Sequence, residues 1–436
     1  MKLNSITIKV CFLILITLLM QLPSAMIMSI ISERQSYQED VKQQLTESVS
    51  GEQTVLGPIL VVPYQTSASA KPVNEYILPK DLKINGDLTS ETLKRGIYSF
   101  QKYDSISAFT GQFDTAAISK LQQSGKIIGT PYLSMGIKDV RGLSTVGQAV
   151  LDNQSFSFQP SARLNSFSSG IHAPLAGINL TQKSTIDFAI SINLLGTARL
   201  SYIPIGENTE LQLVGNWPNP KFTGERSPSE RTVEKKGFTA KWNSSWFANN
   251  LNQTFLEAEA SEVANSLADN PKTYSFDTDL IQTVDHYQLN ERSVKYSILL
   301  IGMTFLCFFL FEILKQMRVH PIQYVLVGVA LSVFYLLLLA LSEQIGFKWA
   351  YLAASVACVG QIGFYVSHIL HSFKRGLGFS VLLSLLYAAI YALLQSEDMA
   401  LLIGSVGLFV VMSVVMILTR RLNWYALSSE HNPPIA

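Results

Sequence analysis

Six separate stretches of this 436-residue chain are long and apolar enough to cross a lipid bilayer, and they constrain the fold more than any other feature. A spanning helix needs about 20 mostly apolar residues. None of the six stretches carries a charge near its middle, where an unpaired charge opposes insertion. We therefore predict six transmembrane helices, over roughly Val10–Ile31, Tyr296–Leu314, Ile322–Leu341, Trp349–Leu370, Gly376–Leu394 and Met399–Leu418.

The charged residues are concentrated between the first two of these stretches. Residues 32–295 hold 24 of the 33 basic residues and 27 of the 32 acidic ones, so this part is nearly neutral and lacks the dense basic surface that nucleic-acid binding needs. We predict an N-terminal segment over residues 1–9, a first transmembrane helix over 10–31, a large soluble domain over 32–295, a five-helix membrane domain over 296–418 and a tail over 419–436.

The loops between the apolar stretches alternate in charge, which predicts the orientation of the chain. The loops on the opposite side carry a single basic residue, Lys348, together with Glu343, Glu397 and Asp398. Because basic loops stay inside, we expect both termini in the cytoplasm and residues 32–295 in the periplasm. The eight basic residues of the inner side are Lys2, Lys9, Lys315, Arg318, Lys374, Arg375, Arg420 and Arg421.

Two interpretations of the first apolar stretch remain, a retained anchor and a cleaved signal peptide. Its apolar character runs past Pro23 and Ala25 to Ile31, further than a signal peptide usually extends. Pro23 also fits poorly three residues before a cut that follows Ala25. We favour the retained anchor.

The soluble domain is predicted to be rich in β-strands. Thr185–Asn193 alternates strictly between apolar and polar residues, as a half-buried strand does. We expect its hairpin partner to contain Leu211 and Leu213, after a turn over Ile205–Thr209. Further strands are predicted over Val55–Val62, Leu82–Leu88, Ile97–Phe100 and Ser105–Phe113.

Three helices are predicted within the same domain. Ser32 is a suitable N-cap for a polar stalk helix that Gly51 would end. A second helix runs between Asp114 and Gly125, and a third covers Leu256–Leu267. All three cysteines lie in apolar stretches, so the domain is expected to fold without disulfides.

Few polar residues form a pattern that indicates chemistry. His368 and His371 could share a metal ion, but two histidines do not fill a tetrahedral shell and an interfacial position explains them. Glu312 is expected to pair with Lys315 or Gln316 one turn away and to have a structural role. Gln361 and a stripe of hydroxyl residues are expected to join helices. The stripe consists of Ser380, Ser384, Tyr387 and Tyr391.

Motifs of catalysis are not found in the sequence. It contains no Gly-rich phosphate loop, no Gly-x-Ser-x-Gly elbow, no His-Glu-x-x-His and no Cys-x-x-Cys. The small residues of Ser166–Gly170 lack the opening glycine of such an elbow and predict a loop. We predict no catalytic, cofactor-binding or metal-binding residue and no enzymatic activity.

Two segments of the soluble domain are unusually rich in aromatic residues and proline. These segments, Asn216–Phe222 and Trp246–Leu251, are either part of the core or an exposed partner surface. We expect Trp246 to lie in the core. Trp217 is left open, because Pro218 and Pro220 beside it are typical of an exposed turn.

Several segments also resemble one known family. They are Asn216–Phe222, Ser244–Leu251, Tyr287–Leu289 and, as the most specific run, Lys295–Glu343, which includes His320–Gly328 and Phe334–Glu343. Together they resemble the CreD family of cell-envelope integrity inner-membrane proteins over nearly the whole chain. The resemblance implies a Gram-negative inner-membrane protein of an envelope or metabolic stress response, with effects on β-lactam response and colicin tolerance. It implies no catalytic residues.

We therefore expect a non-enzymatic inner-membrane protein that supports cell-envelope integrity. Its partners would be the lipid bilayer and, through the periplasmic domain, an envelope protein or another envelope component. One alternative is a transporter or channel for a small envelope-related solute, although no predicted span carries a mid-membrane charge. The other alternative is a stress receptor, which would need a partner kinase because its cytoplasmic loops are short.

Overall fold

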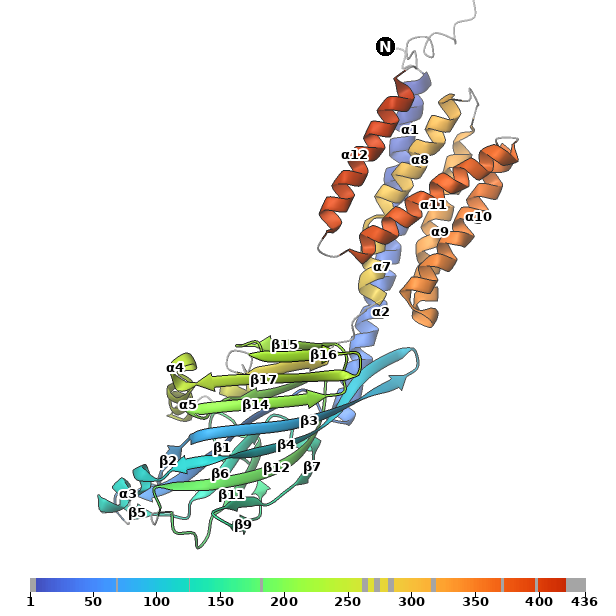
Figure 1. Cartoon of the computed structure of the whole chain (residues 1–436). Helices are drawn as coiled ribbons and strands as arrows, with labels where there is room; N and C mark the ends of the chain where they lie inside the picture. The colour runs from blue at the N-terminus through green and yellow to red at the C-terminus, as the bar shows by residue number, and fades with distance from the viewer. Residues whose placement is uncertain are drawn as a thin grey trace, which may run out of the picture. The chain divides into compact units, whose positions relative to one another are not determined.

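The computed structural model divides the chain into two compact units (Figure 1). It describes residues 5–67, 70–124, 126–180, 183–260, 266–269, 275–280, 286–314, 319–369, 372–396 and 399–420. The β-rich unit is Asp40–Thr283, and the helical unit combines Met1–Glu39 with Val284–Ala436. The predicted boundaries of the soluble domain, residues 32 and 295, lie further out because the flanking helical residues pack with the helical unit.

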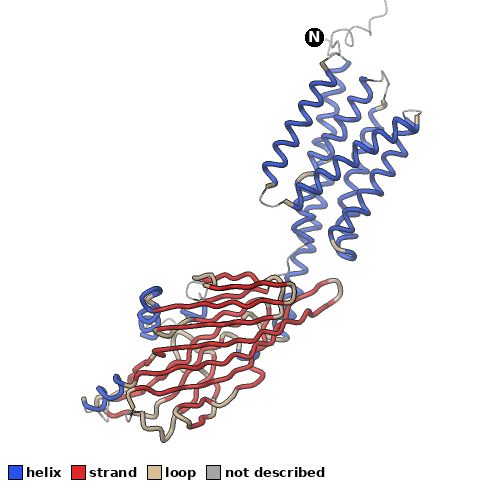
Figure 2. Tube along the Cα trace, in the orientation of Figure 1, coloured by secondary structure: helices blue, strands red, loops and turns tan. Residues whose placement is uncertain are grey.

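The described strands of the β-rich unit form two sheets, drawn as red layers in Figure 2. The first sheet has the order β10-β11-β6-β1-β13-β18-β15, with β2 and β5 also paired to β1. Its strands are β1 (Gln53–Gln65), β2 (Val73–Ile77), β5 (Ile127–Ile128), β6 (Tyr132–Ile137), β10 (Gln159–Pro160), β11 (Gly170–Pro174), β13 (Arg199–Ile203), β15 (Pro220–Gly224) and β18 (Phe276–Leu280).

The second sheet has the order β16-β17-β14-β3-β4-β12-β8-β9, with β7 also paired to β12. Its strands are β3 (Pro79–Arg95), β4 (Tyr98–Asp114), β7 (Leu143–Val146), β8 (Ala149–Leu151), β9 (Gln154–Phe156), β12 (Thr185–Thr197), β14 (Asn208–Gly215), β16 (Glu230–Glu234) and β17 (Gly237–Ser245).

Alternating side chains explain why the second sheet buries one face. On β12, Ile186, Phe188, Ile190 and Ile192 are buried, whereas the residues between them are mostly exposed. The predicted strand over Thr185–Asn193 is thus confirmed. Successive side chains of a strand point to opposite faces, so each apolar residue of this run reaches the core.

The core lies between the two sheets. Trp242 of β17 stacks on Phe276 of β18 with ring centroids 5.9 Å apart. The Tyr202 hydroxyl of β13 is 2.6 Å from the Ser107 hydroxyl of β4, and one continuous cluster of buried apolar residues includes both sheets. The unit is therefore a β-sandwich, in which the inner faces of two sheets share one core.

The predicted hairpin between β12 and the strand around Leu211 is wrong. β12 pairs with β4, β7 and β8, while β14 pairs with β17 and, in parallel, with β3. The physical reason is β13, which follows β12 along the chain and belongs to the other sheet. The chain therefore returns to the second sheet at β14, which β3 and β4 separate from β12.

Short helices occupy the connections of the sandwich. They are α3 (Ala116–Gln123), α4 (Trp246–Asn249), α5 (Leu251–Ala260) and α6 (Ser266–Asp269). The predicted helix after Asp114 corresponds to α3, and its predicted end at Gly125 lies outside the described residues. The predicted helix over Leu256–Leu267 corresponds to parts of α5 and α6, and residues 261–265 lie outside the described part.

The N-terminal helices extend further than predicted. They are α1 (Ser5–Leu19) and α2 (Gln21–Ser48). Taken together, the 39 residues of Ile8–Thr46 form one helix that is long enough and apolar enough to span a membrane. Ser32 therefore does not begin a helix but lies inside α2. Good helix formers lie on both sides of it, among them Met26 and Met28 before it and Glu33, Arg34 and Gln35 after it, so the helix continues through the change in polarity.

The remaining helices belong to the helical unit. They are α7 (His286–Lys295), α8 (Ser297–Leu314), α9 (Pro321–Ile345), α10 (Phe347–Ile369), α11 (Phe373–Gln395) and α12 (Ala400–Thr419). Among the described residues, four helices are long and apolar enough to span a membrane: the long N-terminal helix, α9, α10 and α11. α7 and α8 add a fifth if this pair, bent by 44°, is one span.

Six spans are therefore more than the described helices support. The second predicted span covers α8, which is long and apolar enough to span a membrane only when α7 is counted with it. The sixth covers α12, whose apolar part, Leu402–Ile417, is shorter than the other spans. α8 and α9 pack together, since Phe305 and Phe308 both contact the Tyr324 ring edge to face.

Candidate binding site

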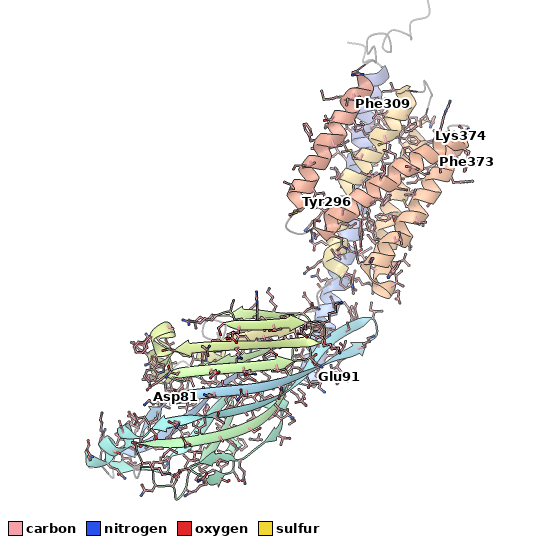
Figure 3. All side chains as sticks on the ribbon, viewed as in Figure 1. Asp81, Glu91, Tyr296, Phe309, Phe373 and Lys374 are labelled. Carbon is pink, nitrogen blue, oxygen red and sulfur yellow. The ribbon has the colours of Figure 1, made fainter. Side chains whose placement is uncertain are left out.

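The histidine pair of the fourth predicted span is described only in part. His368 is exposed near the end of α10, where its ring lies 4.6 Å from the Phe364 ring and its Nδ1 is 3.0 Å from the Phe364 carbonyl oxygen. His371 lies outside the described residues. The next helix begins at Phe373 and Lys374, which Figure 3 labels.

Glu312 is buried at the end of α8 and has three partners from elsewhere in the helical unit. Its carboxylate pairs with the Lys9 ammonium of α1 and accepts hydrogen bonds from the Tyr324 hydroxyl at 2.8 Å and the Val319 amide at 2.9 Å. Lys315 and Gln316, the predicted partners, lie outside the described residues. The Glu312 carboxylate therefore joins α1, α8 and α9.

The hydroxyl stripe of α11 has partners within and between helices. Ser380 and Ser384 donate to carbonyl oxygens one turn earlier, at 3.0 and 2.8 Å. The Tyr387 hydroxyl donates to the Cys358 sulfur of α10 at 3.2 Å. One member of the stripe thus bonds another helix, whereas the two serines bond their own. Gln361 is exposed on α10.

The core tryptophan of the sandwich is Trp242, not Trp246. Trp242 is 1% exposed and its indole nitrogen donates to the Arg226 carbonyl oxygen at 3.2 Å. Trp246 is half-buried on α4, just beyond the end of β17, where the alternation of the strand no longer directs it inward. Trp217 is half-buried too and packs against the core.

A polar cleft lies over three adjacent strands of the second sheet, and Ala248 of α4 also lines it. Its volume is about 430 Å³. One row of its side chains comes from Asp81, Asn208 and Ser245, which pair across β3, β14 and β17. The next outward-facing row is Lys83, Glu210 and Asn243. We call this the β3–β14–β17 cleft.

The charges of the cleft balance each other. The Lys83 ammonium lies 3.9 Å from the Glu210 carboxylate, and both side chains are largely exposed. The Asn208 amide donates to Asp81 at 3.3 Å, and the Arg226 guanidinium donates to the Ala248 carbonyl oxygen of α4 at 3.1 Å. Arg226 and Ala248 also line the cleft. These residues supply donors and acceptors on a surface without net charge.

An exposed aromatic residue stands next to the cleft. Phe247 precedes Ala248 on α4, and its side chain is fully exposed at 102%. The neighbouring Trp246 indole nitrogen is buried with no hydrogen-bond partner among the described residues. An apolar ring beside a row of amides and carboxylates suits a partner with both polar and apolar surface.

Burial raises the pKa of Glu207, an acidic residue beside the cleft. Glu207 precedes β14, and burial raises the pKa of its carboxyl, with a smaller opposing effect of Lys80 and further increases from Asp114 and Asp81. Its backbone carbonyl accepts a hydrogen bond from the Trp246 amide at 3.0 Å. Glu207 thus positions α4 through its main chain.

The serine cluster of residues 166–170 is a structural loop. The Ser166 hydroxyl donates to the buried Glu259 carboxylate, which also accepts from the Asn165 and Ser166 amides at 2.9 Å each. Glu259 on α5 therefore holds this loop in place. The sequence predicts the loop but not its carboxylate, which lies 93 residues away along the chain.

The residues of the β3–β14–β17 cleft were not predictable as a group. Asp81 and Asn208 become neighbours only through the parallel pairing of β3 and β14. Trp246–Leu251 was the one segment of this region that aromatic content singled out. Figure 3 labels Asp81 on the β-rich unit.

One protein family matches nearly the whole chain. Residues 5–425 match the family described as "Inner membrane protein CreD". The chain is 36% identical over 421 residues to Inner membrane protein CreD of Escherichia coli (strain K12), which covers 94% of this chain and 92% of that protein. A crystal structure of an M1 zinc metallopeptidase from Deinococcus radiodurans aligns with 38% of this chain and 39% of its own at 7% identity, but its TM-score is only 0.19.

Proposed function

The chain belongs to the CreD family of inner membrane proteins, and we propose that it supports the integrity of the cell envelope without being an enzyme. In this proposal the β-rich unit lies in the periplasm and contacts an envelope component, while the helical unit anchors it. The distribution of basic loop residues supports this orientation, with eight on one side and one on the other.

The observation that carries the proposal is the β3–β14–β17 cleft with Phe247 beside it. Its balanced charges and amide side chains offer hydrogen bonds to a polar partner. Phe247 offers apolar surface that would become buried on binding, and phenylalanine is among the aromatic residues enriched at protein interfaces. The cleft therefore favours a binding role over a catalytic one.

Site-directed crosslinking in living cells tests the proposal. A photoreactive residue in place of Asn208 or Phe247 should capture a defined envelope component. The same residue in place of Asn153, which is exposed in the turn between β8 and β9, is the matched control. Equal capture from all three positions would contradict a binding site at the cleft.

A second experiment connects binding with envelope integrity. Phe247→Ser changes an exposed side chain, so the protein should reach its normal level while complementation of a deletion strain fails under envelope stress. Exposed Leu256 of α5 provides the control, since Leu256→Ser should complement. Flux of solute through vesicles containing the purified protein would instead favour the transporter alternative.

A further inference from the structure

A groove runs along the surface of the helical unit between α10 and α11. Its volume is about 590 Å³. Its lining begins at Lys348 in the first turn of α10 and continues through Leu352 and Val356 to Gly360, with Tyr387 and Tyr391 facing from α11. These positions recur every three or four residues, so each helix presents one continuous face to the groove.

The interior of this groove is apolar despite its hydroxyl groups. The Tyr351 hydroxyl donates to the Tyr387 carbonyl oxygen at 2.8 Å, and the Tyr387 hydroxyl donates to Cys358. Ser355 and Ser384 donate to carbonyl oxygens of their own helices at 3.0 and 2.8 Å. Because these groups are satisfied within the protein, the groove presents hydrocarbon and aromatic surface and suits a hydrocarbon chain.

One end of the groove has the properties of a membrane interface. Lys348 and Trp349 are exposed there, and the Lys348 ammonium lies 5.8 Å from the centre of the Trp349 ring. Tryptophan and lysine are enriched where the hydrocarbon meets the headgroups. The Lys348 charge and the positive end of the α10 dipole both favour an anion at this end. Glu343, the acid nearest before Lys348 in sequence, accepts a hydrogen bond from the Tyr287 hydroxyl at 2.9 Å.

The length of the groove identifies the kind of chain that fits. Twelve residues separate Lys348 from Gly360, which at 1.5 Å per residue is about 18 Å. Half of a hydrocarbon core of about 30 Å is about 15 Å. The groove therefore matches an acyl chain confined to one leaflet, not a polyprenyl chain long enough to cross the bilayer.

We propose that the groove between α10 and α11 binds one acyl chain of an anionic glycerophospholipid, with its phosphate beside Lys348. The chain would pass between Leu352 and Tyr391 and end near Gly360. Such a lipid would pack between two helices that otherwise leave this face open. This proposal is independent of the cleft in the β-rich unit and of any partner there.

Gly360 makes the proposal testable. A Cβ atom added there would meet no other atom within 4 Å, so Gly360→Leu should fold and fill the end of the groove. Gly378 on α11 is the matched control, because it is also helical, also has open space around it and does not line the groove. Lys348→Gln tests the headgroup contact separately.

The readout is native mass spectrometry of the full-length chain released from nanodiscs that contain phosphatidylglycerol and phosphatidylethanolamine. The wild type and Gly378→Leu should retain phosphatidylglycerol in preference to phosphatidylethanolamine by about fivefold, the effect of one lysine at an anionic surface. Gly360→Leu should retain several-fold less lipid, and Lys348→Gln should lose the preference between headgroups.

Three outcomes would overturn the proposal. Equal retention by Gly360→Leu and Gly378→Leu would mean annular lipid only. The absence of a headgroup preference in the wild type would remove the phosphate contact with Lys348. A retained mass that matches a polyprenyl phosphate, in protein purified from native membranes, would show that the assigned chain is wrong.

Discussion

Trp242 is the side chain whose loss should cost the sandwich most. It is fully enclosed between the sheets, stacks on Phe276 and contacts the Phe222 ring edge to face at 5.5 Å. Trp242→Ala should lower the free energy of unfolding by about 3–5 kcal/mol, since it leaves a large cavity. Urea unfolding followed by circular dichroism measures the change.

Phe247→Ala is the control for this measurement. Its side chain is fully exposed, so the free energy of unfolding should change by less than about 0.5 kcal/mol. A comparable loss in both variants would place the core elsewhere.

Asp139 should make the stability of the β-rich unit depend on acid. Hydrogen bonds from the Arg141 side chain, and then from the Gly51 and Arg141 amides, lower the pKa of its carboxyl to about 2 against the opposing effect of burial. Because the folded pKa is lower than the unfolded one, Asp139 stabilises the fold above about pH 4. This contribution is lost as the pH falls from about 4 to 2.

Urea unfolding at a series of pH values from 5 to about 2 tests this, with Asp139→Asn for comparison. The variant should be less stable than wild type at pH 5, and the difference should shrink toward pH 2. A constant difference across that range would show that Asp139 is not the titrating group.

At the scale of elements, the alternation of apolar and polar residues predicted individual strands but not which strands pair with them. Thr185–Asn193 was recognisable because its residues alternate, and alternation reflects burial of one face. The strand that pairs with it was not recognisable, because nothing in the sequence of β13 indicates that β13 joins the other sheet. The error at Trp246 has a similar origin. Phe238, Ala240 and Trp242 continue the inward alternation of β17, and Trp246 lies beyond the end of that strand.

The Lys9–Glu312 pair should hold the N-terminal helix in the helical unit. Lys9→Ala leaves the Glu312 carboxylate buried without its cation. Loss of one partner of a buried pair costs about 3–5 kcal/mol, and the 28% exposure of Lys9 reduces this to about 1–3 kcal/mol. Thermal unfolding in detergent measures the loss.

Two further variants show whether the loss of stability comes from the unpaired Glu312 carboxylate. Lys374→Ala removes an exposed lysine of α11 and should leave the melting temperature unchanged. Lys9→Met with Glu312→Gln removes both charges and should recover stability relative to Lys9→Ala, because no unpaired charge remains. We predict that α1 is a retained anchor, and N-terminal sequencing of the purified protein tests this prediction.

At the scale of the whole molecule, the orientation of both units can be tested together. A phosphatase fused after Arg420 should be inactive and one fused in the Ser191 region should be active, because the basic loops predict cytoplasmic termini. The opposite activities at either position would contradict the predicted topology. The family match supports the inner membrane as the location.

The order of strands in the first sheet also determines when the sandwich can form. β13 lies between β1, the first strand of the chain, and β18, the last that the structure describes in this unit. A growing polypeptide cannot complete this sheet until nearly the whole unit has left the ribosome, and contacts between such distant residues form slowly. If the unit is exported to the periplasm, as we propose, this order of strands favours an unfolded precursor, because the first sheet cannot close until β18 has joined β13.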